Sequence, residues 1–432
     1  MNNQTFTKDL LAGLTVSFAA LSLGAAFGTM SGRGAFAGMI GAAVIPIITS
    51  LIGGTRLQAS GPTAPMTAVT AVVVANAYEL FPDRTLAEQF ITLVLLMLGA
   101  LLVLSGLLRL GKLILYVPNA VVLGFMNGIA VLIWYDQIAK IFGFGGKTIM
   151  EGSTALNVSV AVGVVVFIFT LPVFIRKIGV PEKYRSFFSA VLLSVIAATL
   201  LTNLLKLPIE NVKLGNSIDS ISEFLTLIGN YFPDGRILTT ENLLKALPFA
   251  LQLMVLGYLD SLLTALVIDR MTKENTNQNK ELVAQGIANA VAGLVQGIPG
   301  AQATIRSVLL IKEDAQTRLA GVLLGVFVLV FLIFFSDWVT LIPAAVFSGV
   351  LFKAGWDVSD REFTQAYFKR GWIKSINRNF QSIIILYTTV VTVLVDLNIA
   401  VISATIMFYL VTKFGKSYHL RDVEHEFEDE ID

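Results

Sequence analysis

Two Gly/Pro-rich loops that interrupt long apolar stretches constrain the fold of this chain most. They read Ser-Gly-Pro-Thr-Ala-Pro at residues 60–65 and Ile-Pro-Gly-Ala-Gln-Ala-Thr at residues 298–304, and each leads from a membrane-length apolar stretch into an unusually short one. Within a bilayer, irregular backbone is tolerated only where it is buried in protein or lines a cavity. Interrupted segments at corresponding positions of two halves are typical of the binding site of a secondary transporter. Two half-helix N-termini aimed at one point, each worth about +0.5 charge, would favour an anion.

The composition supports an all-α membrane protein. Apolar residues make up 55% of the 432 positions and charged residues only 14%, and the mean hydropathy is +0.76. A spanning helix needs about 20 apolar residues. We find fourteen apolar stretches, at residues 10–30, 34–53, 62–78, 89–108, 116–142, 157–175, 186–205, 243–269, 281–297, 303–312, 318–335, 337–355, 378–395 and 397–414.

The basic residues predict the orientation of these segments, because Lys and Arg concentrate in cytoplasmic loops. With the N-terminus inside and fourteen spans, the cytoplasmic loops hold 22 of the 31 Lys and Arg residues, and the outer loops hold eight. No small-residue cleavage site follows the N-terminal apolar stretch, so we expect no removable signal peptide. The sequence therefore predicts a multi-pass protein of the inner or plasma membrane with both termini in the cytoplasm.

The fourteen segments divide into two sets of seven. The first repeat covers about residues 9–205 and the second about residues 243–414, with a polar outer connector at 207–240 and a short acidic cytoplasmic tail at 415–432. An odd number of spans per repeat forces the two repeats into opposite orientations. Segments 3 and 10 would then approach the middle of the membrane from opposite sides as half-helices, each preceded by a short extended segment.

Several other function classes have little support. The net charge of +1 indicates no nucleic-acid partner. Cysteine is absent, the two histidines lie in the tail, and no Gly-x-x-x-x-Gly-Lys-Ser/Thr loop occurs. We therefore expect neither an enzyme nor a resident cofactor.

A set of motifs in one order resembles the membrane domain of the SulP anion transporters. The resemblance covers nearly the whole chain, and the motifs read Asp-Leu-Leu-Ala-Gly-Leu-Thr (9–15), Ala-Phe-Gly-Thr-Met-Ser-Gly (26–32), Gly-Pro-Thr-Ala-Pro-Met-Thr (61–67), Leu-Asp-Ser-Leu-Leu-Thr (259–264), Glu-Leu-Val-Ala-Gln-Gly-Ile-Ala-Asn (281–289) and Ile-Pro-Gly-Ala-Gln-Ala-Thr-Ile-Arg-Ser (298–307). The resemblance implies seven-plus-seven inverted repeats, a core domain of segments 1–4 and 8–11, and a gate domain of segments 5–7 and 12–14. It also implies an elevator-like movement of core against gate, and a homodimer.

One feature of the family is missing from this sequence. SulP proteins usually carry a cytoplasmic STAS domain after the last span, whereas only about eighteen residues follow Phe414 here. Either the natural protein lacks that domain, or the sequence is part of a longer chain.

Asp260 is the first candidate for a functional residue. It stands well inside segment 8, where a carboxylate costs about 2.5–3.5 kcal/mol on insertion scales. Thr264 follows one helical turn later on the same face, and oxygen ligands of this kind suit a hard cation such as sodium. Two alternatives are a structural Asp, protonated or paired with an Arg or backbone donors, and a proton-coupling carboxylate.

The resemblance is greatest to the cyanobacterial sodium-dependent bicarbonate transporters of the family. In that subgroup the Asp, the Thr one turn later and the loop before segment 10 bind sodium. The corresponding positions here are Asp260, Thr264, Gln302, Ala303 and Thr304. Gln302 is a departure, because the subgroup usually has Gly there; its side chain could add a ligand or crowd the site.

The two loops would also supply the anion site. Thr63 would offer a hydroxyl and a backbone N–H, and Ala303 and Thr304 would offer backbone N–H groups. The resemblance suggests that Arg306 adds positive potential near the anion, with a salt bridge to an intramembrane carboxylate as the alternative. Phe27 could form an apolar wall of the substrate site.

The sequence features predict a secondary transporter of an anion, and the resemblance implies that it symports sodium and bicarbonate by an elevator-type mechanism. One alternative is a proton-coupled sulfate or dicarboxylate transporter. Another is an exchanger or channel-like protein without cation coupling, and a nucleobase transporter of the related fold is more distant. A lone carboxylate beside the site, Asp260, argues for coupling.

Overall fold

The structure is a computed structural model that describes residues 3–146, 149–179, 190–211, 226, 231–334, 340–359, 376–395 and 397–414. The predicted acidic tail with both histidines, and most of the predicted outer connector, lie outside these residues. The described part contains fourteen α-helices, one 3-10 helix (Leu110–Tyr116) and two short strands.

Each of the fourteen predicted apolar segments corresponds to one helix. The helices are α1 (Asn3–Met30), α2 (Ala35–Ile52), α3 (Ala64–Leu80), α4 (Arg84–Leu107), α5 (Asn119–Phe142), α6 (Thr154–Lys177), α8 (Ala190–Leu204), α10 (Thr240–Thr272), α11 (Gln278–Leu294), α12 (Thr304–Lys312), α13 (Leu319–Phe334), α15 (Ala344–Val358), α17 (Ile376–Leu394) and α18 (Leu397–Phe414). Among the described residues, α1, α2, α4, α5, α6 and α10 are each long and apolar enough to cross a membrane. The predicted helical class and segment positions are confirmed.

The two Gly/Pro-rich loops form short extended segments, as predicted. Strand β1 (Ser60–Gly61) precedes α3, and strand β2 (Ala301–Gln302) precedes α12. The strands pair antiparallel, with Ser60 opposite Gln302 and Gly61 opposite Ala301. Segments that are far apart in sequence therefore meet immediately before the N-termini of α3 and α12. Of these, only α12, with 9 residues, is short as predicted; α3 has 17 residues, so its prediction as a half-helix is wrong.

Contacts between Cα atoms divide the chain into two compact units. The first comprises Met1–Gly111 and Gln137–Lys353, and the second comprises Lys112–Asp136 and Ala354–Asp432. The second contains α17, α18 and most of α5, which the resemblance assigns to the gate domain. The first also contains α6 and α8, which the resemblance likewise assigns to the gate, so the division into core and gate stays a prediction.

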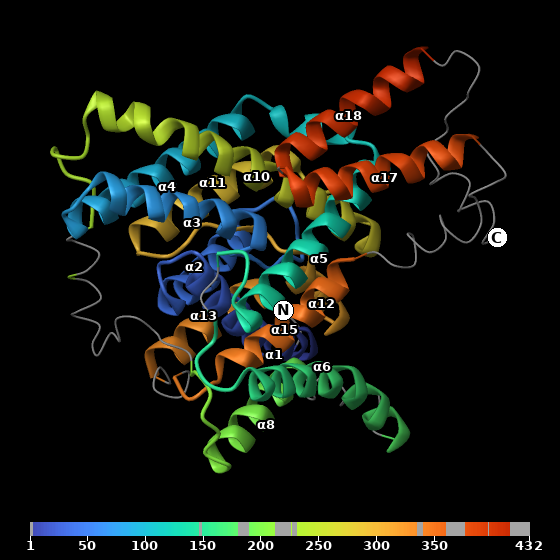
Figure 1. Ribbon diagram of the computed structural model, residues 1–432. Helices are drawn as coiled ribbons and strands as arrows, with labels where there is room; N and C mark the ends of the chain where they lie inside the picture. Colours follow the sequence, from blue (N-terminus) through green and yellow to red (C-terminus); the bar gives the residue numbers. More distant parts are fainter. Residues whose placement is uncertain are drawn as a thin grey trace. The chain divides into compact units, whose positions relative to one another are not determined.

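The first unit contains two groups of three mutually contacting helices (Figure 1). Helices α1, α2 and α13 form one group, and α4, α10 and α11 form the other, while α2 also contacts α11. Small side chains such as Ala12, Ala20, Ala42 and Ala43 fill the first group, with Leu324 of α13 among them. Small residues let helices approach closely where no water drives their association.

The contact between α1 and α2 is close enough to exclude any side chain at Gly38. A Cβ atom there would lie 1.9 Å from the carbonyl oxygen of Gly24 and 2.5 Å from the backbone nitrogen of Gly28. Both neighbours are backbone atoms, which cannot rotate away. The chain at α2 must therefore move as a whole if this position gains even a methyl group.

We expect the substitution Gly38→Ala to lower the free energy of unfolding by about 1–3 kcal/mol, the usual cost of overpacking. Thermal unfolding of the purified protein in detergent measures this. Gly163→Ala in α6 is the matched control, because no heavy atom lies within 4 Å of its added Cβ. That control should be neutral or stabilising by up to about 1 kcal/mol, since Ala favours helix over Gly. Equal effects of the two substitutions would contradict the packing account.

Candidate functional site

The residue before β2 lies directly against the backbone of β1, and this contact together with the strand pairing is called the strand crossing below. A Cβ atom at Gly300 would lie 2.1 Å from both the carbonyl carbon and the oxygen of Gly61, so only glycine permits this approach. Asn289 of α11 holds Gly300 in place: Gly300 N donates to Asn289 Oδ1 at 2.8 Å, and Asn289 Nδ2 donates to Gly300 O at 2.9 Å. The crossing is thus fixed by a buried side chain as well as by strand pairing.

A buried carboxylate on α11 holds the segment that leads into β1. Glu281 is fully buried. Its Oε2 accepts hydrogen bonds from Gly54 N at 2.8 Å, Thr55 N at 3.0 Å and Gln58 Nε2 at 3.1 Å. Its Oε1 accepts from Gln285 Nε2 at 2.9 Å. Such a set of donors makes burial of the charge tolerable.

The polar face of α11 was not identified from the sequence. Glu281, Gln285 and Asn289 are all fully buried, and Gln285 Nε2 also donates to Ser60 Oγ of β1 at 2.7 Å. The three side chains stand four residues apart, so they occupy one face of the helix. That spacing of polar residues inside an apolar helix is the signal that could have identified them.

Two helix N-termini follow the crossing directly. Thr63 is the N-cap of α3 and Ala303 is the N-cap of α12, both with extended backbone, and neither side chain caps its helix. Proline in the first turn of α3 suits a position whose N–H would be unpaired anyway. The first N–H groups of each helix have no intrahelical partner, so both ends present donors and partial positive charge.

Asp260 lies beside these ends, in the interior of α10. The residue is only 7% exposed, and the Thr63 hydroxyl is next to its carboxylate. Neither Asp260 Oδ2 nor Thr63 Oγ1 completes a hydrogen bond of regular geometry with any described residue. One turn later, Thr264 Oγ1 and Thr304 Oγ1 are 2.7 Å apart and join α10 to α12. The predicted set of Asp260, Thr264 and Thr304 is therefore brought together with Thr63.

Arg306 faces the same place from the first turn of α12. It is 1% exposed, and its Nη2 donates to the carbonyl oxygen of Pro62 at 3.0 Å. Its Nε and Nη1 are buried without a hydrogen-bond partner among the described residues. Asp260 acts on Arg306 electrostatically, yet within the described chain no carboxylate forms an ion pair with it at 4.0 Å or less. These two N–H groups therefore remain without a partner in the part of the chain that the structure describes.

Polar groups of Gln302 and Ala303 form hydrogen bonds with neighbouring residues of the protein. Gln302 Oε1 accepts from Thr55 Oγ1 at 3.3 Å, and its backbone N–H donates to Ser261 Oγ at 3.2 Å. Ala303 N donates to Ala59 O at 3.3 Å. The side-chain carbonyl of Gln302 thus points at Thr55, and the Ala303 N–H is engaged by the protein.

Phe27 lies in the last turns of α1 and is 6% exposed. Helix α1 contacts both α3 and α12, so Phe27 belongs to a helix that borders the site. Its role as an apolar wall stays a prediction.

Comparison with known proteins agrees with this architecture. The profile of the sulfate permease family matches residues 6–373. YvdB of Bacillus subtilis (strain 168), described provisionally as a sulfate transporter, is 31% identical over 417 residues, which cover 95% of this chain and 74% of YvdB. The bicarbonate transporter BicA of Picosynechococcus sp. is 32% identical over 412 residues, which cover 91% of this chain and 68% of BicA.

The solved transmembrane domain of a cyanobacterial bicarbonate transporter BicA has the same fold. It superposes with a TM-score of 0.72 at 30% identity and covers 93% of this chain and 98% of that domain. The family match, these relatives and the apolar helices together describe a multi-pass membrane transporter of anions. The chain therefore belongs to the sulfate permease (SulP) family.

Proposed function

We propose that this protein symports sodium and bicarbonate across the inner or plasma membrane by an elevator-type alternating-access mechanism. One observation carries the proposal: a buried carboxylate, Asp260, lies where two helix N-termini meet and forms no ion pair at 4.0 Å or less with any residue that the structure describes. The N-termini would attract an anion, while the carboxylate requires positive charge. A site that contains both is suited to an anion and a cation bound together.

Sodium is the cation that the neighbouring oxygen atoms suit. The proposed ligands are the Asp260 carboxylate, the hydroxyls of Thr264 and Thr304, and main-chain oxygen atoms of Gln302 and Ala303. Carboxylate, hydroxyl and carbonyl oxygens are the ligands that hard cations take. The Gln302 side chain is assigned a different task, because its carbonyl already accepts from Thr55.

Bicarbonate would lie between the two helix N-termini. The donors there are the Thr63 hydroxyl and the Nε and Nη1 groups of Arg306, which have no hydrogen-bond partner among the described residues, and first-turn N–H groups such as that of Thr304, which have no intrahelical partner. Phe27 would limit the pocket. Such donors can hold a singly charged anion without a tight ion pair, and a transporter must also release its substrate.

The helix contacts support two inverted repeats of seven segments. A shift of seven segments relates α1 to α10, α2 to α11, α3 to α12 and α4 to α13. The contacts follow that relation. The contact of α2 with α13 corresponds to the contact of α11 with α4. The contact of α1 with α13 corresponds in the same way to the contact of α10 with α4. Likewise α1 contacts α2, α3 and α12, while α10 contacts α11, α12 and α3. Cytoplasmic termini, from the distribution of basic residues, and a homodimer, from the family resemblance, belong to the same proposal.

Sulfate, moved with protons, is the second candidate. Arg306 has two N–H groups without a partner among the described residues, and such a buried guanidinium could serve a doubly charged anion. YvdB is described provisionally as a sulfate transporter. Uptake of labelled sulfate into the same vesicles distinguishes this candidate from the first.

The substitution Asp260→Asn tests the coupling. In proteoliposomes with an inward sodium gradient, we expect sodium-stimulated uptake of labelled bicarbonate to fall by at least about tenfold, as expected for the loss of a metal ligand. Asp269→Asn, the same substitution on the same helix, is the matched control and should keep sodium stimulation, because Asp269 accepts from Thr276 and lies outside the proposed ligand set.

Three results would contradict the symport proposal. Bicarbonate uptake by the unmodified protein that does not depend on the sodium gradient would indicate an uncoupled pathway. Sodium-stimulated uptake that persists in Asp260→Asn would also contradict the proposal. Sulfate uptake that ignores sodium while bicarbonate is not taken up would favour the second candidate.

The substitution Arg306→Lys tests the anion site. Lysine keeps the charge but lacks the planar set of donors that reaches Pro62 and the ligand. We expect the KM for bicarbonate to rise about tenfold, the loss of one good charge-assisted hydrogen bond. The sodium concentration for half-maximal uptake should change less. A KM equal to that of the unmodified protein would remove Arg306 from the anion site.

The substitution Gln302→Gly tests whether the side chain at this position binds sodium. We expect the half-maximal sodium concentration to stay within about twofold, an effect of ~0.5 kcal/mol, because the side chain bonds Thr55 and not the proposed ion. Sodium dependence of bicarbonate uptake measures it. A loss of sodium affinity as large as that of Asp260→Asn would show that the Gln302 amide is a ligand.

A further inference from the structure

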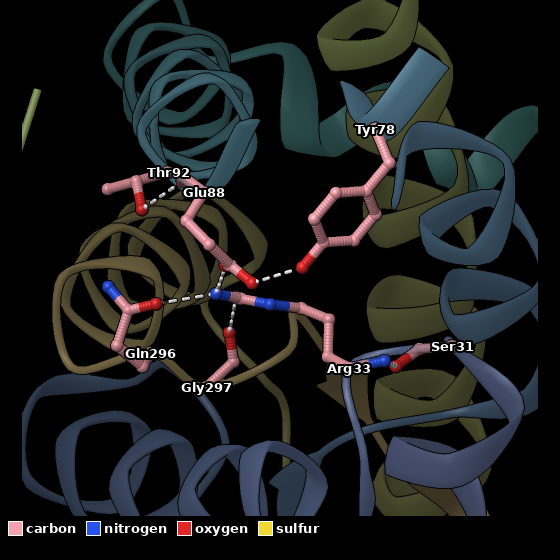
Figure 2. Close-up of polar contacts among 7 residues, drawn as sticks. All are labelled: Ser31, Arg33, Tyr78, Glu88, Thr92, Gln296 and Gly297. Carbon is pink, nitrogen blue, oxygen red and sulfur yellow. Dashed lines mark hydrogen bonds and ion pairs between the residues drawn. The ribbon is translucent and has the colours of Figure 1, made fainter. Parts of the chain in front are cut away.

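A cluster of polar side chains joins four segments of the first unit, and none of its members belongs to the proposed substrate site (Figure 2). Arg33, in the turn between α1 and α2, lies at its centre. Its Nη2 bonds Glu88 Oε2 of α4 at 2.5 Å and Gln296 Oε1 at 2.6 Å, and its Nη1 donates to Gly297 O at 3.0 Å. Tyr78 donates its hydroxyl to Glu88 Oε1 at 2.5 Å.

Both charges of the cluster are withdrawn from solvent. The side chains of Arg33 and Glu88 are 3% and 8% exposed. A buried ion pair of this kind adds little to stability in itself, but removal of one partner leaves the other charge buried and unpaired. We therefore look for the role of the Arg33–Glu88 pair in the geometry that it imposes on the segments it joins.

The segments lead to the two halves of the substrate site. Gln296 and Gly297 follow α11 and come just before Gly300 and strand β2, which opens into α12. Gln296 has a φ of +65°, an uncommon value for a residue with a side chain, at the end of α11, where its N–H donates to Gly293 O and the N–H of Gly297 donates to Ala292 O. Its side-chain carbonyl accepts from Arg33. Tyr78 lies in the last turn of α3.

One ion pair thus fixes the chain that enters α12 and the far end of α3. Ile298 N also donates to Ala37 O of α2 at 3.1 Å, so the entering chain is tied on two sides. A helix is stiff along its axis. A change at Tyr78, or at Gln296 and Gly297, would therefore shift the N-termini at Thr63 and Thr304.

We propose that Arg33, paired with Glu88, is a positioning residue for the anion site: it sets the relative placement of the two helix N-termini that bind the substrate. The inference rests on the proposed function of that site. It predicts that damage to the pair weakens anion binding although no atom of the pair touches the anion.

The substitutions Arg33→Gln and Arg33→Lys test this proposal. Arg33→Gln should raise the KM for bicarbonate by about tenfold, since displacements of ~1 Å at a binding site can cost up to about a hundredfold. The maximal rate per folded protein should fall less. Arg33→Lys keeps the charge opposite Glu88 but lacks the planar guanidinium that reaches Gln296 and Gly297. Its KM should therefore lie between that of the unmodified protein and that of Arg33→Gln.

Hydrogen exchange of backbone amides gives a readout that does not depend on which anion is transported. In Arg33→Gln, the amides of residues 298–304 should exchange faster than in the unmodified protein. The matched control is Lys245→Gln, which breaks the exposed pair of Lys245 and Glu241 in the same unit and should change neither KM nor exchange.

Two milder variants separate the two connections and guard against a failure to fold. Gln296→Gly is compatible with the positive φ and removes one bond to Arg33, so faster exchange should be confined to residues 298–304. Tyr78→Phe removes only the bond from α3, so faster exchange should be confined to the last turns of α3. Both keep the ion pair, and each should raise the KM by less than Arg33→Gln.

These experiments distinguish failure of the positioning role of Arg33 from failure of the proposed bicarbonate transport. If the unmodified protein does not transport bicarbonate, the function fails, but faster exchange of residues 298–304 in Arg33→Gln still supports the positioning role. If the unmodified protein transports bicarbonate and Arg33→Gln changes neither KM nor local exchange, the positioning role is wrong. It is equally wrong if Arg33→Gln lowers only the melting temperature and leaves KM unchanged.

Discussion

The architecture depends on one close contact, the crossing of β1 and β2, where Gly300 lies directly against the backbone of Gly61. The extended segments that precede α3 and α12 can lie inside the membrane only if their backbone N–H and C=O groups form hydrogen bonds with each other. The crossing does this with few residues, and the N–H groups in the first turns of α3 and α12 are left without intrahelical partners. The same contact therefore stabilises the fold and creates the donors of the site.

Buried polar groups around the crossing make it rigid. Asn289 and Gln285 hold the strands, and Glu281 holds the segment that leads into β1. The Glu281 carboxylate accepts hydrogen bonds from four donors, whereas Asp260 Oδ2 has no hydrogen-bond partner in the described part of the chain. Two buried carboxylates in one unit thus differ in their partners: the satisfied one suits a structural role, and the unsatisfied one suits an ion.

Much of the fold could be predicted from the sequence, because hydrophobic length determines a membrane helix. All fourteen segments follow from runs of apolar residues, and the two short extended entries follow from Gly and Pro at residues 60–65 and 298–304. Asp260, Thr264 and Arg306 could be identified because polar residues inside spans are costly. The direction of the Gln302 side chain and the Arg33–Glu88 pair could not, since they depend on which loops meet in three dimensions.

The central claim is that one site binds an anion and sodium together, so that each ion increases affinity for the other. Binding free energies are reciprocal, and the claim can therefore be tested without transport. The direct measurement is equilibrium binding of radioactive sodium to the purified protein, with and without saturating bicarbonate. The account predicts that bicarbonate raises sodium affinity by about 5–150-fold, the usual range of coupling between sites, and that Asp260→Asn abolishes the effect. Sodium binding that is unaffected by bicarbonate would contradict it.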